Sequence, residues 1–174
     1  MLENLLRTRE WLLADGATGT NLFDMGLVSG EAPETWLDLH PDRIIALHAR
    51  FIEAGADIIL TNTFGCNRRR LALHSLEDQT RRLNETAVRL ARQAASGAGR
   101  PIVIAGSVGP TGDLLAPLGP LTAAECEAVF VEQIEGLKAG GAHVAWIETM
   151  SAVEEMHAAA RAAHRCGMPY VITA

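Results

Sequence analysis

The chain has 174 residues, 48% of them hydrophobic and 21% charged, which predicts one globular domain with a substantial core and excludes a disordered chain. Its net charge of −6 at pH 7 argues against a nucleic-acid-binding surface, and the short basic run at Arg68–Arg70 is expected on a solvated loop or helix face. No apolar run approaches the ~20 residues of a membrane span, and the first residues lack the pattern of a signal peptide, so we expect a cytoplasmic protein without a membrane partner.

Apolar runs and amphipathic stretches alternate along the whole chain. After a weak helix signal at 2–10, the expected strands are 11–14, 56–60, 101–105, 143–147 and 169–173. The first long helix is expected from Pro41 to Gly55, and the three later ones are expected to begin at capping boxes, which are Ser75–Asp78, Thr122–Glu125 and Ser151–Glu154. Residues 21–34 contain Gly26, Gly30 and Pro33 without a sustained period, which predicts a long loop with about one helical turn.

Polar side chains follow four of the expected strands, where each strand ends: Asp15, Asn62, Ser107 and Glu148. Strands separated by helices form a parallel sheet with right-handed crossovers, as in an open doubly wound sheet or a (β/α)8 barrel. The chain has neither a GxGxxG segment nor a P-loop, which disfavours a nucleotide-binding sheet. Barrels gather functional groups at the carboxyl ends of their strands. The sequence therefore predicts an α/β fold of the TIM-barrel type, of which this chain supplies about the first five βα units.

Four segments together resemble the homocysteine S-methyltransferase family. They are DGATGT at 15–20, EAGADIILTNTF at 53–64, GSVGPTG at 106–112 and IET at 147–149. The family includes betaine-homocysteine methyltransferase and the homocysteine-binding module of cobalamin-dependent methionine synthase. The resemblance implies that residues 1–174 form the N-terminal portion of a single homocysteine-binding (β/α)8 barrel with no internal domain boundary.

The resemblance also implies a chemistry, methyl transfer to the sulfur of homocysteine to give methionine. In the family, a zinc ion held by three cysteines converts the homocysteine thiol to a thiolate, which attacks the methyl donor. Acidic residues at the ends of the first and fourth strands hold the substrate ammonium group, and they correspond here to Asp15 and Glu148. Backbone N–H groups near Ala17 and Thr18 are then expected to bind the carboxylate. The same pocket is expected to be lined by Asn62, Thr63 and Ser107.

Each of these residues also has a simpler interpretation. Asp15 by itself suits a hydrogen-bond acceptor in a turn, Glu148 suits an ion pair with a neighbouring arginine, and Ser107 suits a cap of the following loop. The six histidines show no metal-ligand spacing, so surface or packing roles are expected for them. The position of Asp15 and Glu148 at the ends of two strands favours the functional interpretation.

The sequence departs from the family in its cysteines. The family's zinc ligands come from a Gly-x-Asn-Cys segment and a Gly-Gly-Cys-Cys segment, and neither occurs in this chain. Cys66, Cys126 and Cys166 do not match those segments, and we expect them to be buried or half-buried free thiols. The zinc cysteines are expected beyond Ala174. This chain alone is therefore expected to bind no stoichiometric Zn²⁺ and to be inactive.

The methyl donor stays open among a corrinoid or folate system, a sulfonium and betaine. Betaine is expected to need an aromatic cage. The animal betaine enzymes have aromatic residues where this chain has Gly65 and Thr149, so betaine is not favoured. Trp36 suits one wall of a donor site or, more simply, a packing role.

Two alternatives to a methyltransferase stay open at this stage. One is a non-catalytic half-barrel that assembles with a second chain or with its own copies through the exposed edges of strands 11–14 and 169–173. The other is a different barrel enzyme, such as a pterin-binding methyltransferase, that shares only the fold.

Overall fold

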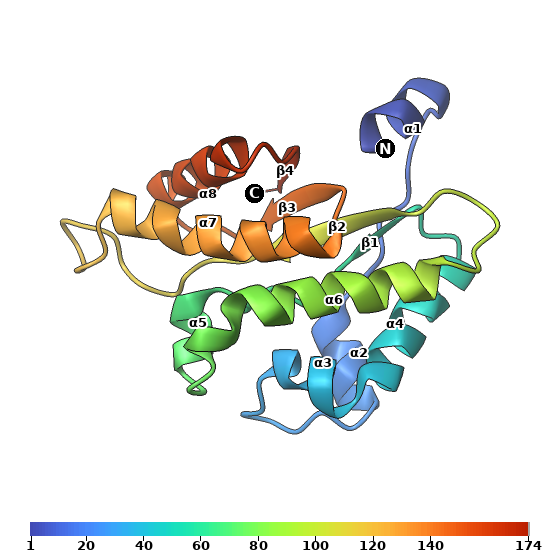
Figure 1. Cartoon of the computed structure of the whole chain (residues 1–174), viewed down its shortest axis with the longest axis horizontal. Coiled ribbons are helices and arrows are strands. Elements are labelled where there is room, and N and C mark those ends of the chain that lie inside the picture. The colour runs from blue at the N-terminus through green and yellow to red at the C-terminus, as the bar shows by residue number, and fades with distance from the viewer. Residues whose placement is uncertain (174) are drawn as a thin grey trace.

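Helices and strands alternate through the computed structural model, which describes residues 1–173 (Figure 1). The helices are α1 (Leu2–Thr8), α2 (Thr18–Asp24), α3 (Trp36–Leu39), α4 (Pro41–Glu53), α5 (Arg68–Ala72), α6 (Thr80–Ala95), α7 (Ala123–Gly140) and α8 (Val153–Arg165), with short 3₁₀ turns η1 (Pro33–Thr35) and η2 (Glu77–Gln79). The strands are β1 (Ile58–Leu60), β2 (Val103–Val108), β3 (Val144–Glu148) and β4 (Tyr170–Thr173). They form one sheet in the order β1-β2-β3-β4, and every pair is parallel, as predicted.

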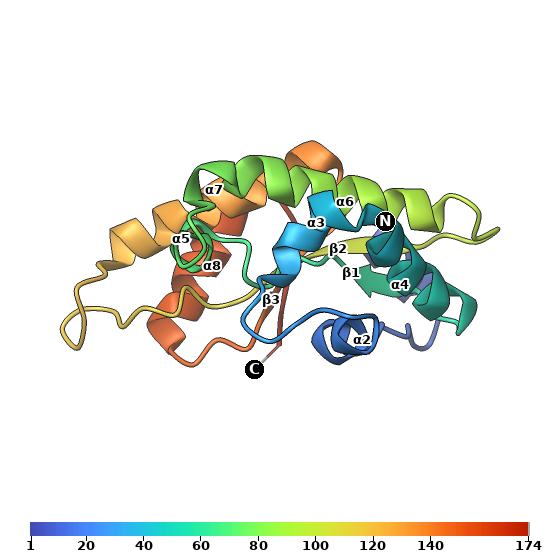
Figure 2. The same ribbon diagram turned by 90° about the horizontal axis from the view of Figure 1, so that it is seen from below.

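The long helices lie on one face of this sheet (Figure 2). Side chains of α6, α7 and α8 pack there on β2 and β3 in the largest apolar cluster, which contains Ile104, Phe130 and Leu137. Gly106 allows Leu137 of α7 to pack closely on β2, because a Cβ atom at this position would lie 2.6 Å from Leu137 Cδ1. The opposite face carries a smaller cluster that is covered in part by α1. Helices on one side of a parallel sheet are the arrangement of a barrel wall, so the structure confirms the predicted fold class.

The strand predicted at 11–14 is reduced to a single parallel bridge between Ala14 and Ile58. The Leu13 carbonyl accepts hydrogen bonds from the N–H groups of Asp57 and Ile58, at 2.7 and 3.1 Å, and the Asp15 N–H donates to the Ile58 carbonyl at 2.9 Å. The segment therefore runs beside β1 as predicted. Within residues 1–173 it has β1 as its single strand neighbour, and the Leu13 side chain is exposed, so a full strand does not form.

The predicted loop at 21–34 contains more helix than expected. Helix α2 already begins at Thr18, η1 begins at Pro33 within the segment, and α3 follows it. Buried Leu22 and Leu27 pack with Trp36 and Leu37 in a second apolar cluster. The spacing of these residues has no helical period because they come from separate short elements, so tertiary packing determines this part of the chain.

One of the three predicted capping boxes is present. Thr122 Oγ1 accepts a hydrogen bond from the Glu125 N–H, and Glu125 Oε2 accepts one from the Thr122 N–H, at the start of α7. Ser75 instead has φ 57, and α6 begins later, at Thr80, after the unpredicted α5 and η2. Helix α8 follows Ala152, without a side-chain cap. None of the helices among the described residues is long and apolar enough to cross a membrane.

Candidate active site

A cavity of about 740 Å³ lies at the carboxyl ends of the strands. Its walls come from four regions, which are the 14–19 loop, the 30–34 segment, the ends of β1, β2 and β3, and residues of and near α5. Six of the seven predicted site residues line it: Asp15, Ala17, Thr18, Asn62, Ser107 and Glu148. Asp15 and Glu148, which lie far apart in the sequence, thus meet at one site, because parallel strand segments direct their carboxyl ends to the same edge of the sheet.

Asp15 is held at the end of the first segment by a backbone contact. Its Oδ2 accepts a hydrogen bond from the Leu60 N–H at 2.8 Å. Burial raises the pKa of Asp15 to about 7, the Leu60 hydrogen bond opposes this rise, and the nearby charge of Glu148 adds to it. The contribution of Glu148 shows that the two carboxyl groups lie close enough at the cavity to interact electrostatically.

Glu148 ends β3 and is oriented by the neighbouring strand. The Ser107 hydroxyl donates a hydrogen bond to Glu148 Oε1 at 2.6 Å. Ser107 lies on β2 and is buried, and β2 and β3 pair in parallel register beside it. Ser107 thus holds the carboxylate, instead of capping the loop that follows β2.

Asn62 and Thr63 have different positions although they are adjacent. Asn62 lines the cavity, and its Nδ2 donates to the Pro33 carbonyl at 2.8 Å, which ties the 30–34 segment to the end of β1. Thr63 is fully buried and does not line the cavity. Its hydroxyl donates to the Ser107 carbonyl at 2.7 Å and contacts the Thr61 hydroxyl. Thr63 therefore lies behind the cavity wall and supports Ser107.

Ala17 and Thr18 form the start of α2. Ala17 is the N-cap residue, and no side chain caps the first N–H groups of this helix. Both residues line the cavity beside Asp15. This wall therefore presents backbone donors, whereas Asp15 presents an acceptor.

Six further charged or aromatic side chains line the cavity and were not predicted as site residues: Glu31, Glu34, Phe64, Arg70, His74 and Trp146. Glu34 is buried, and its Oε1 accepts a hydrogen bond from the Gly65 N–H at 2.9 Å. Burial raises the pKa of Glu34, while hydrogen bonds to backbone N–H groups and the charges of His74 and Arg70 oppose this rise. The only signal in the sequence was an acidic residue in a Gly- and Pro-rich loop, which by itself does not distinguish a buried carboxylate from a solvated one.

Trp36 has the packing role and is not a wall of the cavity. Its side chain is buried in the cluster around α3 and α4, and its Nε1 donates to Glu31 Oε1 at 3.2 Å. Phe64 and Trp146 are the aromatic side chains that line the cavity within the described part of the chain.

The cysteines do not fit a zinc site. Cys66 and Cys126 are fully buried in two different apolar clusters, and Cys166 is half-buried at the end of α8. Burial raises the pKa of the Cys126 thiol to about 12 and that of Cys66 well above its ordinary value. Zinc needs thiolates that converge on one point. Across residues 1–173, no group of three or more His, Cys, Asp or Glu side chains is placed to hold a metal ion.

The histidines other than His74 lie outside the cavity lining. His48 is fully buried on α4, and burial lowers its pKa to about 4. His143 Nδ1 accepts a hydrogen bond from the Ile104 N–H at 2.9 Å. These two side chains have packing roles, as predicted.

Comparison with known proteins identifies relatives of this arrangement. Methionine synthases from Mycobacterium leprae and Mycobacterium tuberculosis are each 31% identical over 163 residues, which cover 88% of this chain. The homocysteine methyltransferase MmuM from Escherichia coli superposes with a TM-score of 0.84 and 27% identity in its metallated form, over 97% of this chain. Its oxidized form gives a TM-score of 0.87 and 25% identity, over 99% of this chain.

The matches cover only part of those relatives. The chain spans 13% and 14% of the two methionine synthases and 64% of each MmuM chain. The sequence profile of the homocysteine S-methyltransferase family matches residues 12–174, nearly the whole chain. This match decides against the alternative of an unrelated pterin-binding barrel. The chain belongs to the homocysteine S-methyltransferase family.

Proposed function

We propose that this chain is the N-terminal portion of a single homocysteine-binding barrel in an enzyme that transfers a methyl group to the sulfur of homocysteine and so forms methionine. Family membership supports the reaction class. The observation that carries the proposal is the convergence of Asp15 and Glu148, from the ends of two separate strand segments, on one cavity.

The two carboxylates bind the substrate ammonium group. A cation that enters the cavity stabilises the ionised form of Asp15, whose proton is otherwise retained up to pH about 7. Glu148 is already oriented by the Ser107 hydroxyl, so it contributes a fixed acceptor. An ammonium group has three donors, and two carboxylates satisfy most of them. The substrate amino acid is thereby fixed at one end.

The other groups of the amino acid are bound by the remaining walls. Backbone N–H groups near Ala17 and Thr18 donate hydrogen bonds to the substrate carboxylate, because the first turn of α2 has no side-chain cap. Asn62 forms part of the wall between the end of β1 and the 30–34 segment. Thr63 acts through Ser107 and is a positioning residue.

The role of this chain ends at substrate binding. Zinc supplies thiolate formation in the family, but the described residues provide no ligand set, so no step is assigned to a metal here. We propose that the chain alone binds no stoichiometric zinc and does not catalyse methyl transfer. Elemental analysis of the purified protein tests this point, and one tightly bound zinc ion per chain would contradict it.

Calorimetric titration with L-homocysteine tests the proposed function. The matched ligand is 4-mercaptobutanoate, which keeps the thiol and the carboxylate but lacks the amino group. We expect L-homocysteine to bind at least about tenfold more tightly, since a hydrogen-bonded charged group contributes ~1.5–3 kcal/mol. Equal affinities for the two ligands would refute the ammonium site.

A further inference from the structure

The backbone of Ser107 is held by side chains, because the neighbouring strand ends too early to pair with it. Strand β1 ends at Leu60, before it reaches the level of Ser107 on β2. The N–H and carbonyl groups of Ser107 instead form hydrogen bonds with the side chains of Thr61, Thr63 and Gln133. These side chains satisfy the backbone groups that a longer β1 would have paired.

Two threonines close a ring of hydrogen bonds around the Ser107 backbone. The Ser107 N–H donates to Thr61 Oγ1 at 3.2 Å, and the Ser107 carbonyl accepts from the Thr63 hydroxyl at 2.7 Å. The two hydroxyl oxygens lie 2.7 Å apart. Because the single hydroxyl proton of Thr63 is donated to the carbonyl, the Thr61 hydroxyl donates to Thr63. The peptide groups on both sides of Ser107 are thus held from the end of β1.

Gln133 supports the same backbone from the helix layer. It lies on α7, its side chain is fully buried, and its Nε2 donates to the Thr63 carbonyl at 2.9 Å and to the Ser107 carbonyl at 3.3 Å. Both contacted atoms are acceptors, so the –NH₂ end of the amide faces them. One side chain therefore joins the carboxyl ends of β1 and β2 to α7, from a position outside the cavity lining.

The hydrogen bonds of Gln133 are expected to add little to stability. Each carbonyl that it contacts has another donor, since the Cys66 N–H reaches the Thr63 carbonyl at 3.0 Å and the Thr63 hydroxyl reaches the Ser107 carbonyl. Gln133 Oε1 has no hydrogen-bond partner among residues 1–173, and an unpartnered buried oxygen costs free energy of folding. Stability alone does not explain a glutamine at this position.

We propose that Gln133 is a positioning residue for the ammonium site, because it fixes Ser107, which in turn orients Glu148. This inference rests on the proposed function. The Ser107 hydroxyl donates to Glu148 Oε1 at 2.6 Å, so a shift of the Ser107 backbone moves or breaks that hydrogen bond. A carboxylate that is free to move loses conformational freedom when it binds a cation, which weakens the affinity. Gln133 thus acts on homocysteine binding without contacting homocysteine.

Calorimetric titration of Gln133→Met with two ligands tests this inference. The ligands are L-homocysteine and 4-mercaptobutanoate, which has no ammonium group for Glu148 to bind. We expect the variant to bind L-homocysteine about threefold more weakly, near the lower end of the range for a neutral hydrogen bond, because Gln133 acts through Ser107. The affinity for 4-mercaptobutanoate should change less than about 1.5-fold. Equal losses for the two ligands would indicate a general distortion of the cavity and would overturn the inference.

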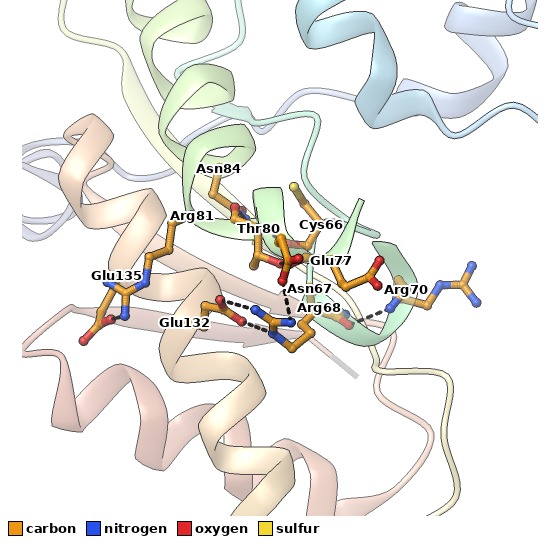
Figure 3. A network of polar contacts seen from close by, with 11 residues as sticks. Cys66, Asn67, Arg68, Arg70, Glu77, Thr80, Arg81, Asn84, Glu132 and Glu135 are labelled. Atoms are coloured by element: carbon orange, nitrogen blue, oxygen red, sulfur yellow. Dashed lines mark hydrogen bonds and ion pairs between the residues drawn. The ribbon is translucent and has the colours of Figure 1, made fainter. Parts of the chain in front are cut away.

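Asn84 on α6 provides a matched control. It is also a fully buried amide, its Nδ2 donates to the carbonyls of Cys66 and Thr80 at 2.8 and 2.7 Å, and its Oδ1 has no partner among the described residues. Figure 3 shows Asn84 close to these two residues. Because Asn84 does not contact Ser107, Asn84→Leu should leave the preference for L-homocysteine over 4-mercaptobutanoate within about 1.5-fold. An equal loss of preference in Asn84→Leu and Gln133→Met would overturn the inference.

A double-mutant cycle tests whether Gln133 acts through Ser107. In Ser107→Ala the hydroxyl that reaches Glu148 is absent, so adding Gln133→Met should lower L-homocysteine affinity by less than about 1.5-fold further. A further loss of about threefold in that background would overturn the inference. Urea denaturation accompanies each titration, and the midpoint of Gln133→Met should not fall below that of the unmodified chain. Gln133→Leu, which also lacks the donor, is titrated in parallel and should give the same change in preference.

A crystal structure of ligand-free Gln133→Met separates this inference from the proposed function. We expect the Ser107 hydroxyl and Glu148 Oε1 to lie beyond hydrogen-bond distance, or Glu148 to occupy more than one conformer. An unchanged hydrogen bond with a single Glu148 conformer would overturn the inference. If the unmodified chain binds L-homocysteine and 4-mercaptobutanoate equally, the proposed function fails, whereas this structure still decides whether Gln133 orients Glu148.

Discussion

Asp15 and Glu148 lie at the same cavity, each at the end of a strand segment, but they have different hydrogen-bond partners. Asp15 accepts one backbone hydrogen bond and has a pKa of about 7, mainly because it is buried. Glu148 accepts a short hydrogen bond from the Ser107 hydroxyl. One carboxylate is therefore poised to change its protonation near neutral pH, and the other is fixed in orientation by a hydroxyl donor.

The pKa of Asp15 predicts how homocysteine binding depends on pH. The ammonium group needs the ionised form of Asp15, which is lost as the pH falls below about 7. We expect the affinity to be about tenfold lower near pH 6 than near pH 8, and we expect this dependence to disappear in Asp15→Asn. Calorimetry across this pH range measures it, and a flat profile in the unmodified chain would exclude Asp15 as the titrating ligand.

The raised pKa of Asp15 also affects the stability of the ligand-free protein. Stability should fall as the pH rises, whereas homocysteine affinity should increase. The folded chain retains the Asp15 proton up to a pKa of about 7, whereas the unfolded chain loses it near the ordinary carboxyl pKa of 3.8. The contribution of this group to the free energy of unfolding therefore falls between these two pH values. Asp15→Asn should stabilise the ligand-free protein at pH 8, by on the order of 2 kcal/mol in urea denaturation. If Asp15→Asn instead destabilises the protein at pH 8, the buried Asp15 carboxylate does not reduce the stability of the folded state.

Glu148 and Ser107 can be separated by substitution. Glu148→Gln removes the charge that faces the ammonium group and should weaken homocysteine binding about tenfold or more. Ser107→Ala leaves the charge but frees its orientation, so it should have a smaller effect in the same titration. A larger effect of Ser107→Ala than of Glu148→Gln would contradict the assignment of Glu148 as the ligand.

At the scale of elements, helix starts show where sequence reasoning succeeds. The Thr122 capping box forms at the predicted start of α7, where the side chains of Thr122 and Glu125 each accept a hydrogen bond from the other residue's backbone N–H. Ser151 lies in a sequence of the same type, yet the helix starts after Ala152 and no side chain caps it. Local sequence therefore predicted that helices exist, whereas packing determined where two of them begin.

This difference predicts a matched pair of stability changes. Thr122→Ala removes both hydrogen bonds of the Thr122 hydroxyl and should lower the free energy of unfolding by ~1 kcal/mol. Ser151→Ala removes no cap and should change it by less than ~0.5 kcal/mol. Urea denaturation compares them, and equal losses would indicate that Ser151 caps α8 in solution.

The polar strand ends were predictable and the remaining cavity walls were not. Asp15, Asn62, Ser107 and Glu148 follow from the rule that barrel strands present function at their carboxyl ends. Glu34 comes from the 3₁₀ turn η1 and Arg70 from the short helix α5, and the positions of both elements depend on long-range contacts, such as the hydrogen bond of Asn67 to Pro110. No local periodicity carries that information.

At the scale of the whole molecule, Asp57 connects the N-terminal segment to the sheet. It is buried at 4% exposure and accepts hydrogen bonds from Arg9 at 2.6 Å, Arg100 at 3.2 Å and the Leu13 N–H at 3.1 Å. The segment that carries Asp15 is thus anchored at the opposite end of β1 from the cavity. Correct placement of Asp15 depends on this anchor because the segment has only one bridge to β1.

Substitution of Asp57 should therefore lower the stability of the protein. Asp57→Ala leaves two arginines without their shared partner and should lower the free energy of unfolding by ~3 kcal/mol. Glu85→Ala, which removes an exposed pair with Arg89, should cost less than ~0.5 kcal/mol. Urea denaturation measures both, and a change below 1 kcal/mol for Asp57→Ala would rule out the anchor.

The central claim is that Asp15, beside β1, and Glu148, at the end of β3, together hold the ammonium group of homocysteine. A crystal structure of this chain with bound L-homocysteine tests it most directly. The account predicts the substrate nitrogen within hydrogen-bond distance of both Asp15 and Glu148, with the substrate carboxylate at the first turn of α2. A substrate nitrogen that contacts neither carboxylate, or a substrate bound outside this cavity, would contradict it.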